Sequence, residues 1–165
     1  TSHNEQSMVA RRLAHFNARA ETLMEFSPRD HQQMAGIALF YDTANFFYFY
    51  MTRGEGENVL RLDIRNNLVF TRPPFTEIGI GDATAVYLRL EVKDLYLDIS
   101  YSLDGESYEY AARGLYLNTL TDEAYFDIGM EGHTGTFIAL ACQDLSGTKN
   151  HADFRYMEYF PTNAD

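Results

Sequence analysis

The segment from residue 84 to residue 102 reads TAVYLRLEVKDLYLDISYS, and it decides the fold class. From Val86 to Lys93 every second side chain is Val or Leu, and the side chains between them are polar or aromatic. This two-residue period is that of a β-strand with one buried face. The pattern restarts after Asp94, so the segment predicts two consecutive strands, at 84–93 and 95–102.

Working outward from this pair, strand-like runs separated by turn residues fill most of the chain. They predict further strands at 8–13, 18–27, 34–42, 45–52, 57–65, 106–111, 136–144 and 151–160. The Asp104-Gly105 pair, which lies between aromatic-rich segments, is a strong hairpin signal. Residues 5–15 could instead form a short helix. Many short strands with regular turns predict an all-β sandwich or barrel built from antiparallel strands.

The alternation also assigns side chains to the two sides of each strand. The predicted core contains Phe49, Leu88, Leu90, Leu97, Ile99, Ile138 and Leu140. The predicted outward face contains Tyr48, Tyr50, Tyr87, Arg89 and Tyr96. Flat rings beside hydrogen-bonding ions suit a sugar, which has an apolar face to stack and hydroxyls to satisfy. The same face could equally be covered by another domain or subunit.

The charge balance excludes several classes of partner. The chain has 165 residues, with 13 Lys and Arg against 24 Asp and Glu, so its formal net charge is −11. Nucleic acids and anionic membranes need a basic footprint, which this composition does not supply. No apolar run reaches the roughly eighteen residues of a membrane-spanning helix. We therefore expect no nucleic-acid partner and no membrane partner.

Catalytic and metal-binding patterns are missing from the sequence. Cys142 is the only cysteine, and the histidines have no metal-ligand spacing. Neither a Gly-x-Ser-x-Gly elbow nor a phosphate loop occurs. We expect no catalytic residue, no metal and no cofactor in this chain. The one weak alternative is a structural calcium ion held by Asp30, Asp144 and Asp153.

Two stretches, 66–83 and 112–135, interrupt the alternation with prolines and glycines. Loops longer than about 12–15 residues in a compact β domain are usually functional. We therefore expect the 112–135 stretch to carry part of the function.

An ordered set of short motifs resembles a known family. The motifs are MVARR at 8–12, QMAGI at 33–37, YDTANF at 41–46, YSLDGESY at 101–108, LTDE at 120–123, GHTGTF at 132–137, CQDLSG at 142–147 and ADF at 152–154. Together they resemble the C-terminal β-sandwich of the glycoside hydrolase family 43 β-xylosidases, which is also classed as carbohydrate-binding module family 91. The resemblance runs in order through almost the whole chain.

The resemblance implies a concanavalin A-like jelly-roll sandwich of two antiparallel sheets. In the family this sandwich follows a five-bladed catalytic β-propeller, which this chain does not contain, and it begins with a further strand or two. The chain is thus expected to be a single sandwich domain over 1–165, a fragment without the propeller and the first sandwich strand. The parent protein would be a glycoside hydrolase, while this chain alone would not be catalytic.

The resemblance also implies a contact with substrate. In the family a loop of the sandwich reaches the mouth of the propeller's active site and places a Phe against the substrate. That loop corresponds to residues 129–135, where this chain reads EGHTG at 131–135 in place of Gly-Phe-Phe-Thr-Gly. Gly132, His133 and Thr134 are therefore the expected substrate-contacting residues, and the imidazole in place of the aromatic wall puts xylose preference in doubt.

Three roles remain open. The sandwich could complete the substrate pocket and stabilise the propeller in xylan breakdown. It could bind xylan or a xylo-oligosaccharide by itself through the tyrosine face, or that face could be only an interdomain or subunit interface. The expected partners are the family 43 propeller, xylan or xylo-oligosaccharide, and a second copy joined through the parent enzyme. A cytoplasmic location is favoured for a bacterial parent.

Overall fold

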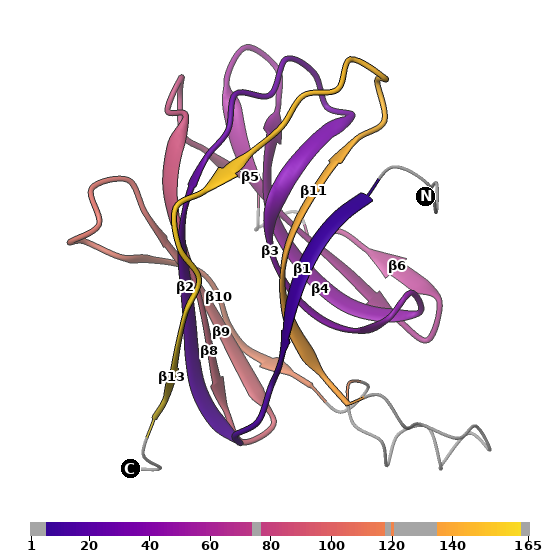
Figure 1. Cartoon of the computed structure of the whole chain (residues 1–165), viewed down its shortest axis with the longest axis vertical. Helices are drawn as coiled ribbons and strands as arrows, with labels where there is room; N and C mark the ends of the chain where they lie inside the picture. Colours follow the sequence, from indigo (N-terminus) through magenta and orange to yellow (C-terminus); the bar gives the residue numbers. More distant parts are fainter. Residues whose placement is uncertain (1–5, 74–76, 118–119, 121–134, 163–165) are drawn as a thin grey trace.

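The computed structural model describes residues 6–73, 77–117, 120 and 135–162, and every element in this part of the chain is a strand. The strands form two sheets that face each other across a shared interior (Figure 1). All pairs of neighbouring strands are antiparallel. The expected all-β sandwich is therefore confirmed. The alternative helix at 5–15 is wrong, because Gln6–Arg12 pairs as a strand.

The first sheet has seven strands over the described residues, and its spatial order is β1-β11-β3-β4-β5-β6. The bounds are β1 Gln6–Arg12, β11 Phe137–Asp144, β3 Gln33–Asp42, β4 Asn45–Arg53, β5 Asn58–Asn66 and β6 Val69–Thr71. The short β7, Ile78–Gly79, pairs with the other end of β5. We call this the large sheet.

The second sheet has six strands over the described residues, and its spatial order is β10-β9-β8-β2-β12, with β13 also pairing to β2. The bounds are β10 Glu109–Tyr116, β9 Tyr96–Ser102, β8 Ala85–Lys93, β2 Asn17–Glu25, β12 Asp153–Phe154 and β13 Glu158–Pro161. We call this the small sheet. Buried and half-buried residues alternate strictly along β2, as expected for a strand with one covered face.

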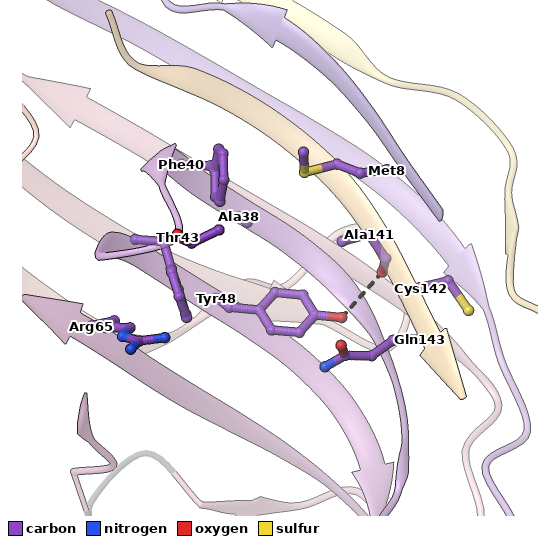
Figure 2. Close-up of a pocket in the computed structure, with 10 residues that line it drawn as sticks. Met8, Ala38, Phe40, Thr43, Tyr48, Arg65, Ala141, Cys142 and Gln143 are labelled. Atoms are coloured by element: carbon purple, nitrogen blue, oxygen red, sulfur yellow. Dashed lines mark hydrogen bonds between the residues drawn. The ribbon is translucent and has the colours of Figure 1, made fainter. Parts of the chain in front are cut away.

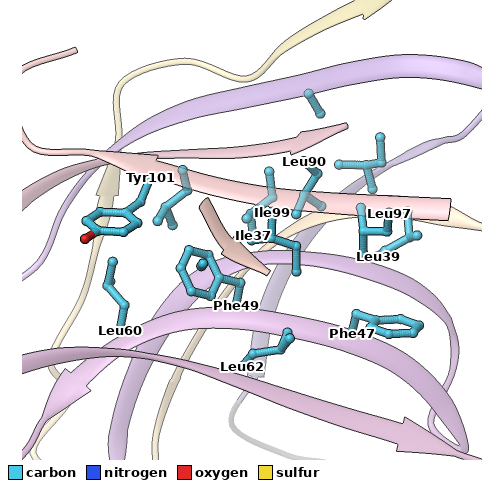
Figure 3. Close-up of a cluster of buried hydrophobic side chains, with 14 of the residues drawn as sticks. Ile37, Leu39, Phe47, Phe49, Leu60, Leu62, Leu90, Leu97, Ile99 and Tyr101 are labelled. Carbon is cyan, nitrogen blue, oxygen red and sulfur yellow. The ribbon is translucent and has the colours of Figure 1, made fainter. Parts of the chain in front are cut away.

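The core lies between the two sheets, and Figure 3 shows its side chains reaching inward from both. All seven core residues predicted from the alternation are buried, and none is more than 7% exposed. The register explains this agreement. Leu90 on β8 lies opposite Ile99 on β9 and opposite Ala20 on β2, so inward residues of neighbouring strands meet.

Three predicted boundaries are wrong. The run 151–160 is two short strands, because Arg155 N donates to Leu23 O and Thr22 Oγ1 donates to the Tyr156 carbonyl between them. The predicted strand 106–111 is β10, which extends to Tyr116 through two register shifts. The stretch 66–83 is not only loop, because it contains β6 and β7.

The chain crosses from the small sheet to the large sheet between β10 and β11. Both ends of this crossing are fixed. Leu120 is 3% exposed in the core, and its N–H donates to the Leu117 carbonyl. Thr136 Oγ1 donates to the Leu120 carbonyl at 2.5 Å, and Leu13 N donates to the Thr136 carbonyl. The two points where the chain enters and leaves the crossing are therefore joined to each other.

In the described part of the chain no helix is long and apolar enough to cross a membrane.

Candidate functional site

The five residues predicted to share one outward face lie on two opposite faces of the sandwich. Tyr48 and Tyr50 are on the outer side of the large sheet. Tyr87, Arg89 and Tyr96 are on the outer side of the small sheet. The prediction of a single face is wrong, because alternation separates inward from outward within a strand but does not say which sheet the strand joins.

Tyr48 is also buried, at 8% exposure, although it points away from the core. Its neighbours across the large sheet are small: Ala38 lies opposite it on β3, and Ala139 lies opposite Ala38 on β11. The ring therefore lies flat over β3, and its hydroxyl donates to the Ala141 carbonyl on β11 at 3.1 Å (Figure 2). A strand face that carried larger side chains would hold this ring upright in solvent.

Tyr50 stacks on Tyr48, with ring centroids 4.8 Å apart. The Tyr50 hydroxyl donates to Asp63 Oδ2 at 3.0 Å. The Arg72 guanidinium donates to both carboxylate oxygens of Asp63, at 2.7 and 3.0 Å. Burial and the Asp63 charge raise the pKa of Tyr50, and burial raises the pKa of Tyr48. Both phenols are therefore neutral hydrogen-bonding groups near pH 7, suited to binding and not to proton transfer.

A hollow of about 110 Å³ lies beside the Tyr48 ring on this outer face. Its walls come from β1, β3, β4, β5, β11 and the β3–β4 turn. They are lined by Met8, Ala38, Phe40, Thr43, Phe46, Tyr48, Arg65, Ala141, Cys142 and Gln143. The Phe40 and Phe46 rings stack at 6.4 Å, so the wall is mainly aromatic with a few polar groups at its margin. This composition is that of a small-molecule site.

The outer face of the small sheet is polar and internally paired. Arg89 donates to Glu21 Oε2 at 2.7 Å, and its guanidinium carbon lies 3.4 Å from the centre of the Tyr108 ring. Tyr156 also donates to Glu21, at 3.1 Å. Burial and the hydrogen bond to Glu21 raise the pKa of Tyr108 to about 12. Arg89 is therefore held by partners within the sheet face, and its charge is compensated.

Tyr96 is more open than these residues, at 53% exposure, and it forms a platform with Tyr116. Tyr116 lies opposite it on β10 and is 51% exposed, and the two ring centroids are 5.5 Å apart. Nearby, Arg113 lies over the Tyr110 ring at 4.3 Å and pairs with Asp98 at 3.8 Å. Alternation along β10 could not add Tyr116 to the predicted face, because two register shifts precede this residue.

The loop residues Gly132, His133 and Thr134 lie outside the described residues, so their expected contact with substrate stays a prediction. The described end of that loop is informative. Gly135 has φ +68°, and a Cβ built on it would lie 2.8 Å from the Arg12 guanidinium. The left-handed backbone favours glycine at this position, whereas the Arg12 guanidinium is the end of a flexible side chain.

The three aspartates proposed for calcium do not form a cluster. Within the described residues no group of three or more His, Cys, Asp or Glu side chains is placed to hold a metal ion. Asp144 instead caps its own turn, because it accepts hydrogen bonds from Ser146, Thr148 and Asn150. The buried Gln33 amide joins the same network at Ser146 Oγ and Thr148 Oγ1. The CQDLSG motif thus has a structural role here.

Comparison with known proteins places this geometry in context. A family model described as the β-xylosidase C-terminal concanavalin A-like domain matches residues 1–160. A xylan 1,3-β-xylosidase of a Vibrio species is 41% identical over 96% of this chain and 29% of its own length. A β-xylosidase of Bacillus subtilis is 36% identical over 96% of this chain and 30% of its own length. The crystal structure of a xylan β-1,4-xylosidase from Bacillus halodurans superposes with a TM-score of 0.86 at 30% identity, over 93% of this chain and 29% of that one.

Proposed function

The chain belongs to the family of C-terminal concanavalin A-like domains of the glycoside hydrolase family 43 β-xylosidases, and from this membership we propose that it is the non-catalytic sandwich of a xylan-degrading glycosidase. One observation carries the proposal. The chain spans only about three tenths of the length of the relatives it matches, while they cover nearly all of it. The catalytic carboxylates that glycoside hydrolysis requires would then lie in the remaining seven tenths.

The finer part of the proposal concerns the 129–135 loop. Its C-terminal end is followed by Thr136, which is hydrogen-bonded to the buried Leu120, so the sandwich would hold that end of the loop in place against a catalytic partner. His133 would then donate or accept a hydrogen bond at a sugar hydroxyl and orient the substrate. It would act by positioning, since carboxylates supply the acid and base of glycoside hydrolysis.

The test uses the full-length enzyme that carries this domain. We expect His133→Ala to raise KM or to shift the preference among short pentosides, while the melting temperature stays unchanged. His31→Ala is the matched control, because His31 is exposed in the turn before β3. Wild-type kinetics for His133→Ala on every pentoside tested would rule out the positioning role of the loop. Full activity of an enzyme lacking residues 1–165 would rule out the domain's role altogether.

The paired tyrosines of the small sheet favour a second role, binding of a xylo-oligosaccharide by the sandwich itself. Tyr96 and Tyr116 are both about half exposed, and their adjacent rings, tilted by 37° to each other, offer apolar surface to a sugar chain. Calorimetric titration of the chain with xylohexaose tests this role. We expect Tyr96→Ala to abolish binding and Phe16→Ala, an exposed aromatic control on the β1–β2 connection, to leave it intact. Absence of any binding heat would rule out this second role and leave the pocket-completing role and the interface role.

A further inference from the structure

The hollow beside Tyr48 contains an arginine whose charge is not compensated. Arg65 on β5 forms no hydrogen bond and no ion pair through its side chain within the described part of the chain, and its Nε is buried without an acceptor. A buried donor that lacks a partner costs free energy, so such a group calls for an explanation, for which a bound water, ion or ligand is a candidate. In Figure 2, Arg65 and Gln143 lie at the two ends of the Tyr48 side chain.

The neighbouring arginines of the same sheet face are in a different situation. Arg61 is four residues earlier on the same side of β5 and pairs with Glu77 at 2.7 Å. Arg72 pairs with Asp63, also at 2.7 Å. In a chain with a net charge of −11, an arginine without an acidic partner is not explained by a shortage of carboxylates. The exception at Arg65 coincides with the hollow, which points to an anionic occupant.

The walls limit what that occupant can be. The hollow has a volume of about 110 Å³, well below the roughly 300–1,000 Å³ of sites for drug-sized ligands, so it accommodates one ring and not an extended chain. Phe40, Phe46 and Tyr48 offer it aromatic surface. Gln143 and the exposed Thr43 add polar groups at the margin. A flat-faced ring that carries both hydroxyls and a carboxylate matches the aromatic wall, the polar margin and the Arg65 guanidinium together.

We propose that this hollow binds a single uronic acid unit, the acidic side branch of a plant polysaccharide, with its ring against the aromatic wall and its carboxylate on the Arg65 guanidinium. The assignment to a sugar rests on the proposed function, and the assignment to an acidic sugar rests on Arg65. The site lies on the large sheet, so it is separate from the Tyr96–Tyr116 platform on the opposite outer face. It would let the domain distinguish decorated from undecorated chains.

The test is a calorimetric titration of the 165-residue chain, with its fold checked by a cooperative thermal melt. The two ligands are a xylo-oligosaccharide and the same oligosaccharide carrying one glucuronic acid branch. We expect the acidic ligand to bind at least tenfold more tightly. R65Q removes this preference, whereas R61Q, the control on the same strand and face, keeps it. Thr43→Phe blocks the hollow from an exposed position and abolishes the preference without lowering the melting temperature.

Equal affinity for the two ligands, no binding of either, or an unchanged preference in R65Q overturns the proposal. A weaker association of the R65Q domain with the catalytic part, without any sugar binding, overturns it as well and assigns the hollow to a protein carboxylate. The proposed function is read from the kinetics of the His133 loop in the full-length enzyme. Failure of the acidic-sugar site is therefore distinguishable from failure of the proposed function.

Discussion

Leu90→Ala should be among the most damaging substitutions in the small sheet. Leu90 is 2% exposed and lies between Ala20 and Ile99 on the neighbouring strands. The change removes three carbon atoms, which at about 0.8 kcal/mol each amounts to about 2.4 kcal/mol of lost burial. The opposite Ala20 is too small to fill the gap, so a cavity term is added and the total reaches about 3–5 kcal/mol.

The adjacent Arg89 points to the other face and makes the matched comparison. From alternation alone, Arg89→Ala should cost far less than Leu90→Ala. The structure increases the expected cost of Arg89→Ala, because the side chains of Arg89 and Glu21 are only 19% and 14% exposed and form a close ion pair. Removing Arg89 leaves the Glu21 carboxylate partly buried without its cation, at a cost of about 1–3 kcal/mol, between the values for exposed and buried pairs.

Urea unfolding of the wild type, both single variants and the Arg89→Ala/Glu21→Gln double variant measures these free energies. Glu21→Gln removes the carboxylate charge that Arg89→Ala leaves unpaired. The double variant should therefore lose less stability than the summed losses of the two single variants, by about 1 kcal/mol or more. Leu90→Ala should show no such coupling to Glu21→Gln. A Leu90→Ala cost below that of Arg89→Ala, or additive behaviour at Arg89 and Glu21, would refute the assignment of these two residues to opposite faces with different roles.

Other substitutions test the turns and the crossing between the sheets. Hydrogen bonds from Ser146 and Asn150 lower the pKa of Asp144, so its stabilising effect is present above about pH 4 and lost as the pH falls; Asp144→Asn should lower the melting temperature at pH 7 and approach the wild type in acid scans. Gly105→Ala should cost about 1–2 kcal/mol in urea unfolding, because φ is +80° there and the new Cβ would lie 2.7 Å from the Tyr87 ring. Thr136→Val should speed proteolytic cleavage between Leu120 and Thr136, whereas Thr136→Ser should not, because serine keeps the hydroxyl bonded to Leu120.

The period of the hydrophobic pattern was enough to predict the fold class and the core. Strands β8 and β9 follow the predicted runs 84–93 and 95–102 to within one residue, because one covered face imposes a strict alternation on their sequence. The same reasoning failed at 151–160, where two short strands pair with β2 around an irregular turn at Arg155. Such an interruption depends on backbone hydrogen bonds that leave no trace in side-chain polarity.

The candidate site was less predictable than the fold. Strand β4 is aromatic on both sides, so alternation could not reveal that Tyr48 and Tyr50 are buried outside the main core. Their burial depends on the small residues of β3 and β11, which become their neighbours only through the strand order of the large sheet. Arg65 was overlooked for a related reason. Arg65 stands out because its buried Nε has no hydrogen-bond partner in the described part of the chain, and pairing between distant residues is not visible in a single sequence.

The joined ends of the crossing between β10 and β11 have a consequence for protein engineering. Leu120 and Thr136 are bonded to each other, and Leu120 is buried in the core, so the sandwich closes this junction with contacts that lie outside residues 121–134. The segment between Leu120 and Thr136 can therefore be replaced by the corresponding segment of a homologue. Chimeras cut at these two residues would exchange this segment between homologues, while both sheets and their shared interior keep their native sequence.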